Sequence, residues 1–241
     1  KKTEVWFPIK IPDSRHAGRK RFYCIRKGTS FKLFFNDEVK YTTCLPFSIR
    51  QKIIIFNGMI KAQIEDKELL AHLDSIEKDE MAVFVMADGR IRGALFNGTG
   101  FVNQMRAQHK TGILETMVLG QASLCAALMM PTMKGMEHLS WRYECDGPAK
   151  GFNVEADSTG YVRGYLFEDH IPVEKPLENW DLAPFLGSGS MTITKIHPGD
   201  KSPQVSSVET LYKNITKDLA WYFSQSEQIN TAFNTSIFMD P

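Results

Sequence analysis

The chain has 241 residues, of which 43% are hydrophobic and 24% are charged. This is the composition of an ordinary soluble protein, so it excludes a chain that is disordered throughout, and the length allows one large core or two smaller ones. No apolar run reaches the roughly 18 to 20 uninterrupted residues of a membrane span, so we expect no membrane segment.

The charge is divided unevenly along the chain. Residues 1–58 contain 13 Lys and Arg against 4 Asp and Glu, whereas residues 59–241 contain 16 against 24, which gives net charges of +9 and −8. A change of this size indicates two pieces of different origin or role. We interpret residues 1–58 as a basic segment that is not native or is disordered, with Met59 as the biological start. The alternative is a basic arm for nucleic acid or a membrane surface.

The first elements predicted after Met59 are a helix and a hairpin. Apolar residues recur at helical spacing in residues 60–78, which predicts a short amphipathic helix with an acidic solvated face. The apolar runs Met81–Met86 and Ile91–Phe96 lie on either side of the turn signal Asp88-Gly89. Asp-Gly turns close hairpins, so these runs are expected to pair as antiparallel strands.

Two helices are expected next. Residues 101–110 predict a helix, and Ile113–Met130 is apolar at the i, i+3 and i+4 positions of a helix face. Pro131 ends this second helix because the residue before a proline disfavours helical geometry. Glu115 and Gln121 interrupt its apolar sequence, which favours a buried core helix over a membrane span.

Residues 138–167 are expected to form the centre of the fold. Apolar and polar residues alternate in three runs, as they do when one face of a strand is buried and the other is solvated. Turn residues at Asp146–Ala149 and Asp157–Gly160 separate the runs. The stretch therefore predicts a meander of three strands whose apolar face is covered by Ile113–Met130.

The remaining chain predicts more strands and one helix. A loop is expected between His170 and Pro184, strands at residues 191–196 and 204–209, a helix at residues 211–223 and a strand at Phe233–Met239. With the earlier elements, this pattern predicts an α+β fold, in which helices pack on a twisted, mainly antiparallel sheet.

Sequence motifs for catalysis or metal binding are absent. The six histidines show no His-x-x-x-His spacing and no two cysteines form a Cys-x-x-Cys, so a zinc or iron site is unsupported. Four cysteines far apart are typical of reduced thiols in a cytoplasm. Cys125 lies on an apolar helix, where a reactive thiolate is disfavoured. We therefore expect no enzyme, and the alternative is an active site that is assembled only in space.

Aromatic residues gather in the predicted meander. With Arg142 and Arg163 they have the composition of a platform for single-stranded nucleic acid, but the acidic charge of residues 59–241 argues against that function. Alternation places part of the set on the face away from the covering helix, where an exposed apolar patch would bind other polypeptides. The predicted polypeptide-binding residues are Trp141, Tyr143, Phe152, Tyr161, Tyr165 and Phe167.

Six stretches occur in an order and at a spacing that resemble one family. The stretches are Gly89–Gly93, Val102–His109, Cys145–Pro148, Val154–Tyr165, Leu186–Gly189 and Asp218–Gln228. Together they are similar to the N-terminal domain of the thirty-three-kilodalton heat-shock chaperones, the redox-regulated holdases of bacteria. The similarity covers about residues 79–241.

This resemblance implies a cytoplasmic stress-response chaperone that binds unfolding client proteins without ATP and dimerises on activation. It also implies a C-terminal zinc domain with four cysteines, in a Cys-x-Cys and a Cys-x-x-Cys pair, whose oxidation expels the metal and unfolds the neighbouring linker. None of the four cysteines here matches that set. We therefore expect a chaperone core without the zinc domain, the redox switch or a cofactor, with unfolded clients and a second copy as its partners. A nucleic-acid-binding protein that uses the basic arm is the other alternative.

Overall fold

The structure is a computed structural model that describes part of the chain. It describes residues 22–27, 30–35, 54–55, 66–76, 78–86, 89–173 and 179–239, and up to residue 55 it describes the backbone only. The chain divides into two units, residues 1–49 and 50–241. In the first unit, β1 (Phe22–Lys27) and β2 (Ser30–Phe35) pair as an antiparallel hairpin, where the sequence predicted no regular element.

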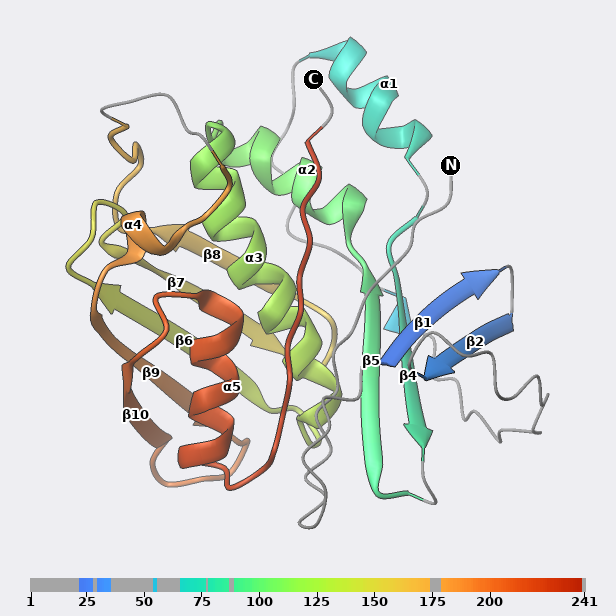
Figure 1. The fold of residues 1–241 in the computed structure, drawn as a ribbon, viewed down its shortest axis with the longest axis vertical. Helices are drawn as coiled ribbons and strands as arrows, with labels where there is room; N and C mark the ends of the chain where they lie inside the picture. The colour runs from blue at the N-terminus through green and yellow to red at the C-terminus, as the bar shows by residue number, and fades with distance from the viewer. Residues whose placement is uncertain are drawn as a thin grey trace. The chain divides into compact units, whose positions relative to one another are not determined.

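A five-stranded antiparallel sheet forms one side of the second unit (Figure 1). Its strand order is β10-β9-β6-β7-β8, so the predicted meander supplies three adjacent strands and the later strands extend it. The strands are β6 (His138–Cys145), β7 (Gly151–Asp157), β8 (Val162–Leu166), β9 (Gly189–Ile196) and β10 (Gln204–Thr210). The predicted α+β fold with a mainly antiparallel sheet is confirmed.

A smaller sheet of β3 (Ile54–Ile55), β4 (Glu80–Met86) and β5 (Ile91–Asn97) contains the predicted hairpin. Between β3 and β4 in the chain lies α1 (Lys67–Ser75), which begins where the Asp66 side chain accepts hydrogen bonds from two backbone N–H groups at 2.9 and 3.1 Å. Such a cap satisfies N–H groups that have no partner within the helix. The predicted helix is thereby confirmed within residues 67–75, and residues 60–65 of the prediction lie outside the described part.

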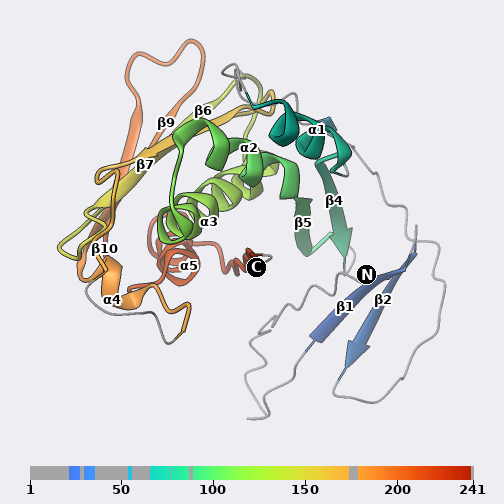
Figure 2. The same ribbon diagram turned by 90° about the horizontal axis from the view of Figure 1, so that it is seen from above.

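Helix α3 (Ile113–Met129) is the centre of the second unit. It follows α2 (Thr99–His109) and continues into the short 3-10 turn η1 (Met130–Thr132). It packs on β7 and β8 and also contacts β5, α2 and α5. Figure 2 shows it inside the curve of the five-stranded sheet. The predicted cover of the meander is therefore confirmed.

The helical stretch Ile113–Thr132 has the length and composition of a membrane span, with a mean hydropathy of 1.6 over its most apolar part. That part is 83% buried inside the fold. Burial by protein on this scale is expected of the core helix of a folded domain, which agrees with the prediction from Glu115 and Gln121.

The chain after β8 differs from prediction at two helices. The short helix α4 (Ala183–Leu186) lies at the end of the predicted loop, with Pro184 in its first turn, where the missing N–H has no cost. Helix α5 (Ile215–Gln225) begins four residues later than predicted because Asn214 caps it by accepting from the Lys217 N–H at 3.1 Å.

The predicted strand at Phe233–Met239 is wrong. Its side chains alternate between half-buried and exposed positions as they do in a strand, but the residues up to 239 belong to no sheet among the described elements. Alternation reports which side chains face the core, whereas a strand also needs a neighbour for its backbone.

Candidate polypeptide-binding surface

Three of the predicted binding residues belong to the core. Trp141, Tyr143 and Phe152 are each 0% exposed and face the helices. The Phe152 ring lies edge-on to Trp141 at 5.0 Å and is stacked on Tyr143 at 5.2 Å. These contacts follow from register, because Tyr143 lies opposite Phe152 in the β6–β7 pair. The three rings stabilise the sheet from inside and offer no surface to a partner in this structure.

The other three predicted residues lie on the outer side of the sheet near β8. Tyr161 and Tyr165 are 45% and 51% exposed, and Phe167 is half-buried. The Tyr165 and Phe167 rings are 5.9 Å apart, and the Arg142 guanidinium lies 4.6 Å from the centre of the Phe167 ring. The structure therefore brings Tyr165, Phe167 and Arg142 together as one exposed aromatic cluster, which we name the β8 aromatic cluster.

Ion pairs surround the β8 aromatic cluster on the outer face of the sheet. Arg142 donates to Glu144 at 2.7 Å, and Arg163 donates to Glu155 at 2.6 Å. The hydrogen bond from Arg142 holds the pKa of Glu144 below its ordinary value. Exposed pairs of this kind contribute little to stability, but they keep the face soluble around an apolar centre. A partner on this face would meet aromatic rings bordered by charges of both signs.

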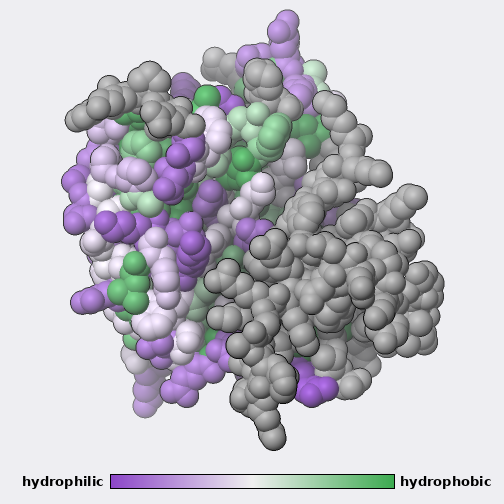
Figure 3. Space-filling model, in the orientation of Figure 1, coloured by the Kyte–Doolittle hydropathy of each residue, from purple (hydrophilic) through white to green (hydrophobic). Residues whose placement is uncertain are grey.

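A second exposed aromatic group lies beside the start of α5. Leu211 and Tyr212 are 54% and 50% exposed, and the Tyr212 ring meets Trp221 at 6.5 Å. The sequence prediction included Leu211 in the helix at residues 211–223 and missed this group. Asn214 was the available signal, since Asn is a preferred N-cap and would have left Leu211 in the preceding loop. Figure 3 shows a largely hydrophilic described face on which hydrophobic residues form separate patches.

A buried carboxylate holds this second group in place. Asp218 is 0% exposed and accepts hydrogen bonds from the backbone N–H groups of Leu211, Tyr212 and Asn214 at 2.8 to 3.0 Å. It also accepts from the Tyr143 hydroxyl at 3.0 Å. Burial, followed by the nearby Asp218 charge, raises the pKa of Tyr143 above its ordinary value. Asp218 therefore joins the β10–α5 loop to the centre of the sheet.

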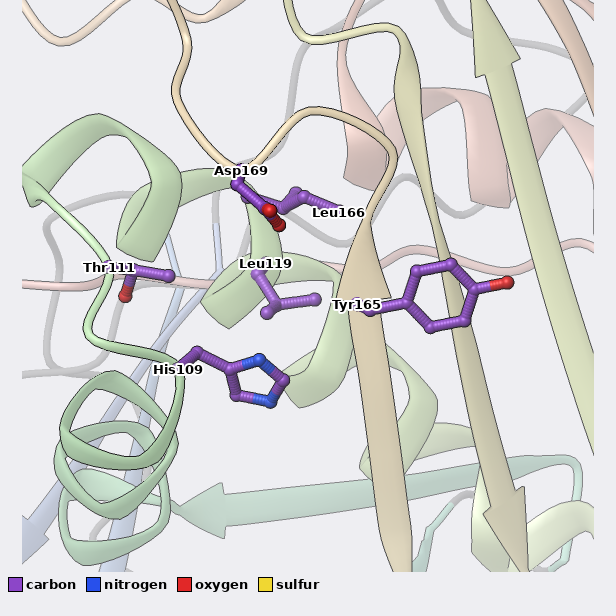
Figure 4. Close-up of a pocket in the computed structure, with 6 residues that line it drawn as sticks. All are labelled: His109, Thr111, Leu119, Tyr165, Leu166 and Asp169. Atoms are coloured by element: carbon purple, nitrogen blue, oxygen red, sulfur yellow. The ribbon is translucent and has the colours of Figure 1, made fainter.

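A small polar pocket lies between the start of α3 and the end of β8 (Figure 4). Its volume is about 40 Å³, which is room for water molecules. Nearby, the buried Glu115 carboxylate accepts from the Ile171 N–H at 2.8 Å and lies 3.3 Å from His170 Nδ1. The residues that line the pocket are His109, Thr111, Leu119, Tyr165, Leu166 and Asp169. The lining includes one His and one Asp but no Arg. The size of the pocket suits solvent better than a substrate.

The described cysteines are poorly suited to redox sensing. Cys125 is 0% exposed, as predicted, and burial raises the pKa of its thiol far above the ordinary value. Burial also raises the pKa of Cys145 to about 11. Since the thiolate is the reactive form, a raised pKa lowers the reactive fraction of both thiols near neutral pH. Among residues 66–173 and 179–239, apart from the gaps at 77 and 87–88, no group of three His, Cys, Asp or Glu side chains could hold a metal ion.

The described elements define an α+β domain with an antiparallel sheet packed on helices and a few exposed aromatic rings on its surface. A profile of the family described as Hsp33 protein matches residues 79–241. The chain belongs to the Hsp33 family, a family of heat-shock chaperones, and the resemblance drawn from six sequence stretches is confirmed.

Individual relatives support the same assignment. The 33 kDa chaperonin of Thermotoga maritima is 33% identical over 158 residues, which cover 64% of this chain and 53% of the relative. The 33 kDa chaperonin of Agathobacter rectalis is 34% identical over 158 residues, which cover 54% of that relative. The crystal structure of the Thermotoga maritima protein, a heat shock protein 33 homologue, is also similar, with a TM-score of 0.62 and 32% sequence identity. The match covers 66% of this chain and 55% of the chain in that crystal structure. The chain spans about half the length of these relatives.

Proposed function

We propose that this chain acts as a holdase, an ATP-independent chaperone that binds unfolding proteins and prevents their aggregation. The observation that supports the proposal most strongly is the β8 aromatic cluster, because it gathers two aromatic rings and a guanidinium on one face of the sheet, and exposed apolar patches are where proteins bind other polypeptides. Family membership supports the same class of function.

The proposal includes activity without a redox switch. Both cysteines whose side chains are described have thiols with a raised pKa, and none of the four matches the family's zinc set. Client binding would then need no oxidation of a cysteine.

Complex formation tests the holdase function directly. The full chain is incubated without ATP at a temperature at which a client enzyme unfolds, and the mixture is separated by size-exclusion chromatography. We expect the unfolding client to elute in a soluble complex with the chain, whereas native client elutes alone. Complete precipitation of the client, with the chain left free in solution, would contradict the proposal.

A further inference from the structure

The segment that follows α5, residues 229–239, crosses the domain without joining a sheet; we call it the strap. From residue 231 to residue 239 its side chains alternate without exception between half-buried and exposed. No backbone hydrogen bond joins residues 230–233 or 235–239 to any other described residue. The strap therefore has the side-chain pattern of a strand, but alternate side chains hold it instead of a backbone ladder.

The strap lies in a groove formed by three helices. A Cβ atom built on Gly120 of α3 would lie 2.7 Å from Ile237 Cδ1, so the absence of a side chain at Gly120 lets Ile237 seat against α3. Val102 of α2 borders the same point at 3.4 Å. The Phe233 ring packs against Phe223 of α5 at 5.5 Å. Figures 1 and 2 show the strap on the side of α3 opposite the five-stranded sheet.

The seating of the strap is incomplete. Its inward side chains are only half-buried, and the Thr235 hydroxyl is buried without a hydrogen-bond partner among the described residues. Its outward Phe238 is 88% exposed. Residues 229–239 contain no proline and no charged residue, and Asp240-Pro241 follow directly. Charge and proline are the devices that exposed edges use against pairing with another chain. A second extended chain could therefore use the same groove.

We propose that the strap is the resident occupant of a polypeptide-binding groove, and that an extended client segment with apolar residues at every second position replaces it. The strap itself shows what the groove accepts: an uncharged, extended segment whose inward side chains match Phe233, Ile237 and Met239. This inference rests on the proposed holdase function and adds a client-binding site to the β8 aromatic cluster.

A peptide with the sequence of residues 229–239 tests the groove without any client. The variant Phe233→Ser with Ile237→Ser removes two anchors of the strap, and fluorescence anisotropy measures binding of the labelled peptide to the full chain. We expect the variant to bind the peptide about tenfold more tightly than the wild type, because its weakened strap competes less for the groove. A tenfold change corresponds to a loss of about 1.4 kcal/mol in the binding of the strap to the groove. Equal affinities for the two proteins would overturn the inference.

Matched peptides separate specific seating from general stickiness. A peptide with Phe233, Ile237 and Met239 replaced by Ser has lost its inward face, and we expect it not to bind. A peptide with only the outward Phe238→Ser change should bind as well as the original. If both altered peptides bind alike, the alternating pattern plays no part and the groove is not the binding site.

A second pair of variants covers the case in which the double serine variant does not fold. Gly120→Ala favours the helix but places its Cβ against Ile237 Cδ1, so the Ile237 side chain must shift and the strap loses part of this anchor. Adding Ile237→Val removes that δ-carbon and lets the strap return. We expect Gly120→Ala to suppress aggregation of a client at about one third of the chaperone concentration that the wild type needs, a threefold change that corresponds to about 0.6 kcal/mol. The double variant should behave as wild type.

The outcomes distinguish the two proposals. A wild-type chain that binds no client contradicts the holdase function, whatever the peptide does. A wild-type chain that binds clients, with Gly120→Ala and its Ile237→Val double variant both unchanged, leaves the holdase function intact and contradicts the strap inference.

Discussion

Asp218 is the residue on which the local structure around α5 depends most. One buried carboxylate accepts four hydrogen bonds, three from the backbone of residues 211–214 and one from Tyr143. Hydrogen bonds to a charged group are stronger than those between neutral groups. Sequence patterns did not predict this network, because an Asp in the first turn of a helix also fits an exposed position that complements the helix dipole.

Asp218→Asn is therefore expected to destabilise the domain by roughly 2 to 4 kcal/mol. The amide nitrogen replaces an acceptor oxygen and opposes either the Tyr143 hydroxyl or a backbone N–H, which leaves buried donors unpaired. Urea unfolding followed by circular dichroism measures the change. Asp200→Asn, at an exposed turn position, is the matched control and should stay within about 0.5 kcal/mol of wild type. A similar small loss for both variants would contradict the role assigned to Asp218.

The exposed rings of the β8 aromatic cluster give the second prediction at the residue scale. Tyr165→Ser with Phe167→Ser is expected to weaken client binding, by about fivefold for each kcal/mol of binding free energy that the two rings supply. Client titrations followed by light scattering measure the effect. Thr194→Ala, on the outer face of β9, is the control and should bind clients as wild type does. Unchanged binding by the double serine variant would remove the cluster from the proposed surface.

At the scale of elements, sequence periodicity predicted the helices and strands that bury one face. It missed the features that polar contacts set. The meander and α3 were predicted because long alternating or helical patterns reflect burial directly. The start of α5 was misplaced because it is set by the Asn214 cap, and the strap was taken for a strand because alternation says nothing about backbone partners. Of the predicted binding residues, Trp141, Tyr143 and Phe152 lie in the core. Trp141 and Tyr143 share the phase of the covered face, so the register could have assigned them to the core.

The turn between β7 and β8 makes stability depend on pH. Burial raises the pKa of Asp157, but hydrogen bonds from Thr159, Tyr161 and Gly160 outweigh it and leave the pKa below its ordinary value. Its folded-state pKa is thus lower than in the unfolded chain, so its contribution to stability is complete above the unfolded value of about 4 and is lost as the pH falls through the folded value.

We expect Asp157→Asn to remove this part of the acid sensitivity of the turn. The unfolding midpoint in urea, measured at pH 7 and again near pH 3, should fall less in the variant than in wild type, while the variant is less stable at pH 7. An identical loss in both proteins on acidification would show that Asp157 does not couple the turn to pH.

At the scale of the whole molecule, the family match covers the second part of the chain. Residues 79–241 match the Hsp33 family, and they span about half of the relatives' length. The charge division between residues 1–58 and 59–241 was visible in the sequence. Whether two copies associate was predicted only through the resemblance, and sedimentation velocity of the full chain is the measurement that checks it.

The central claim is that this domain binds unfolding proteins through surfaces that need no oxidation. Light scattering of a thermally unfolding client, with the full chain present in dithiothreitol and separately after peroxide treatment, tests it most directly. The account predicts the same suppression of aggregation in both conditions. Suppression that appears only after peroxide, or none in either condition, would contradict it.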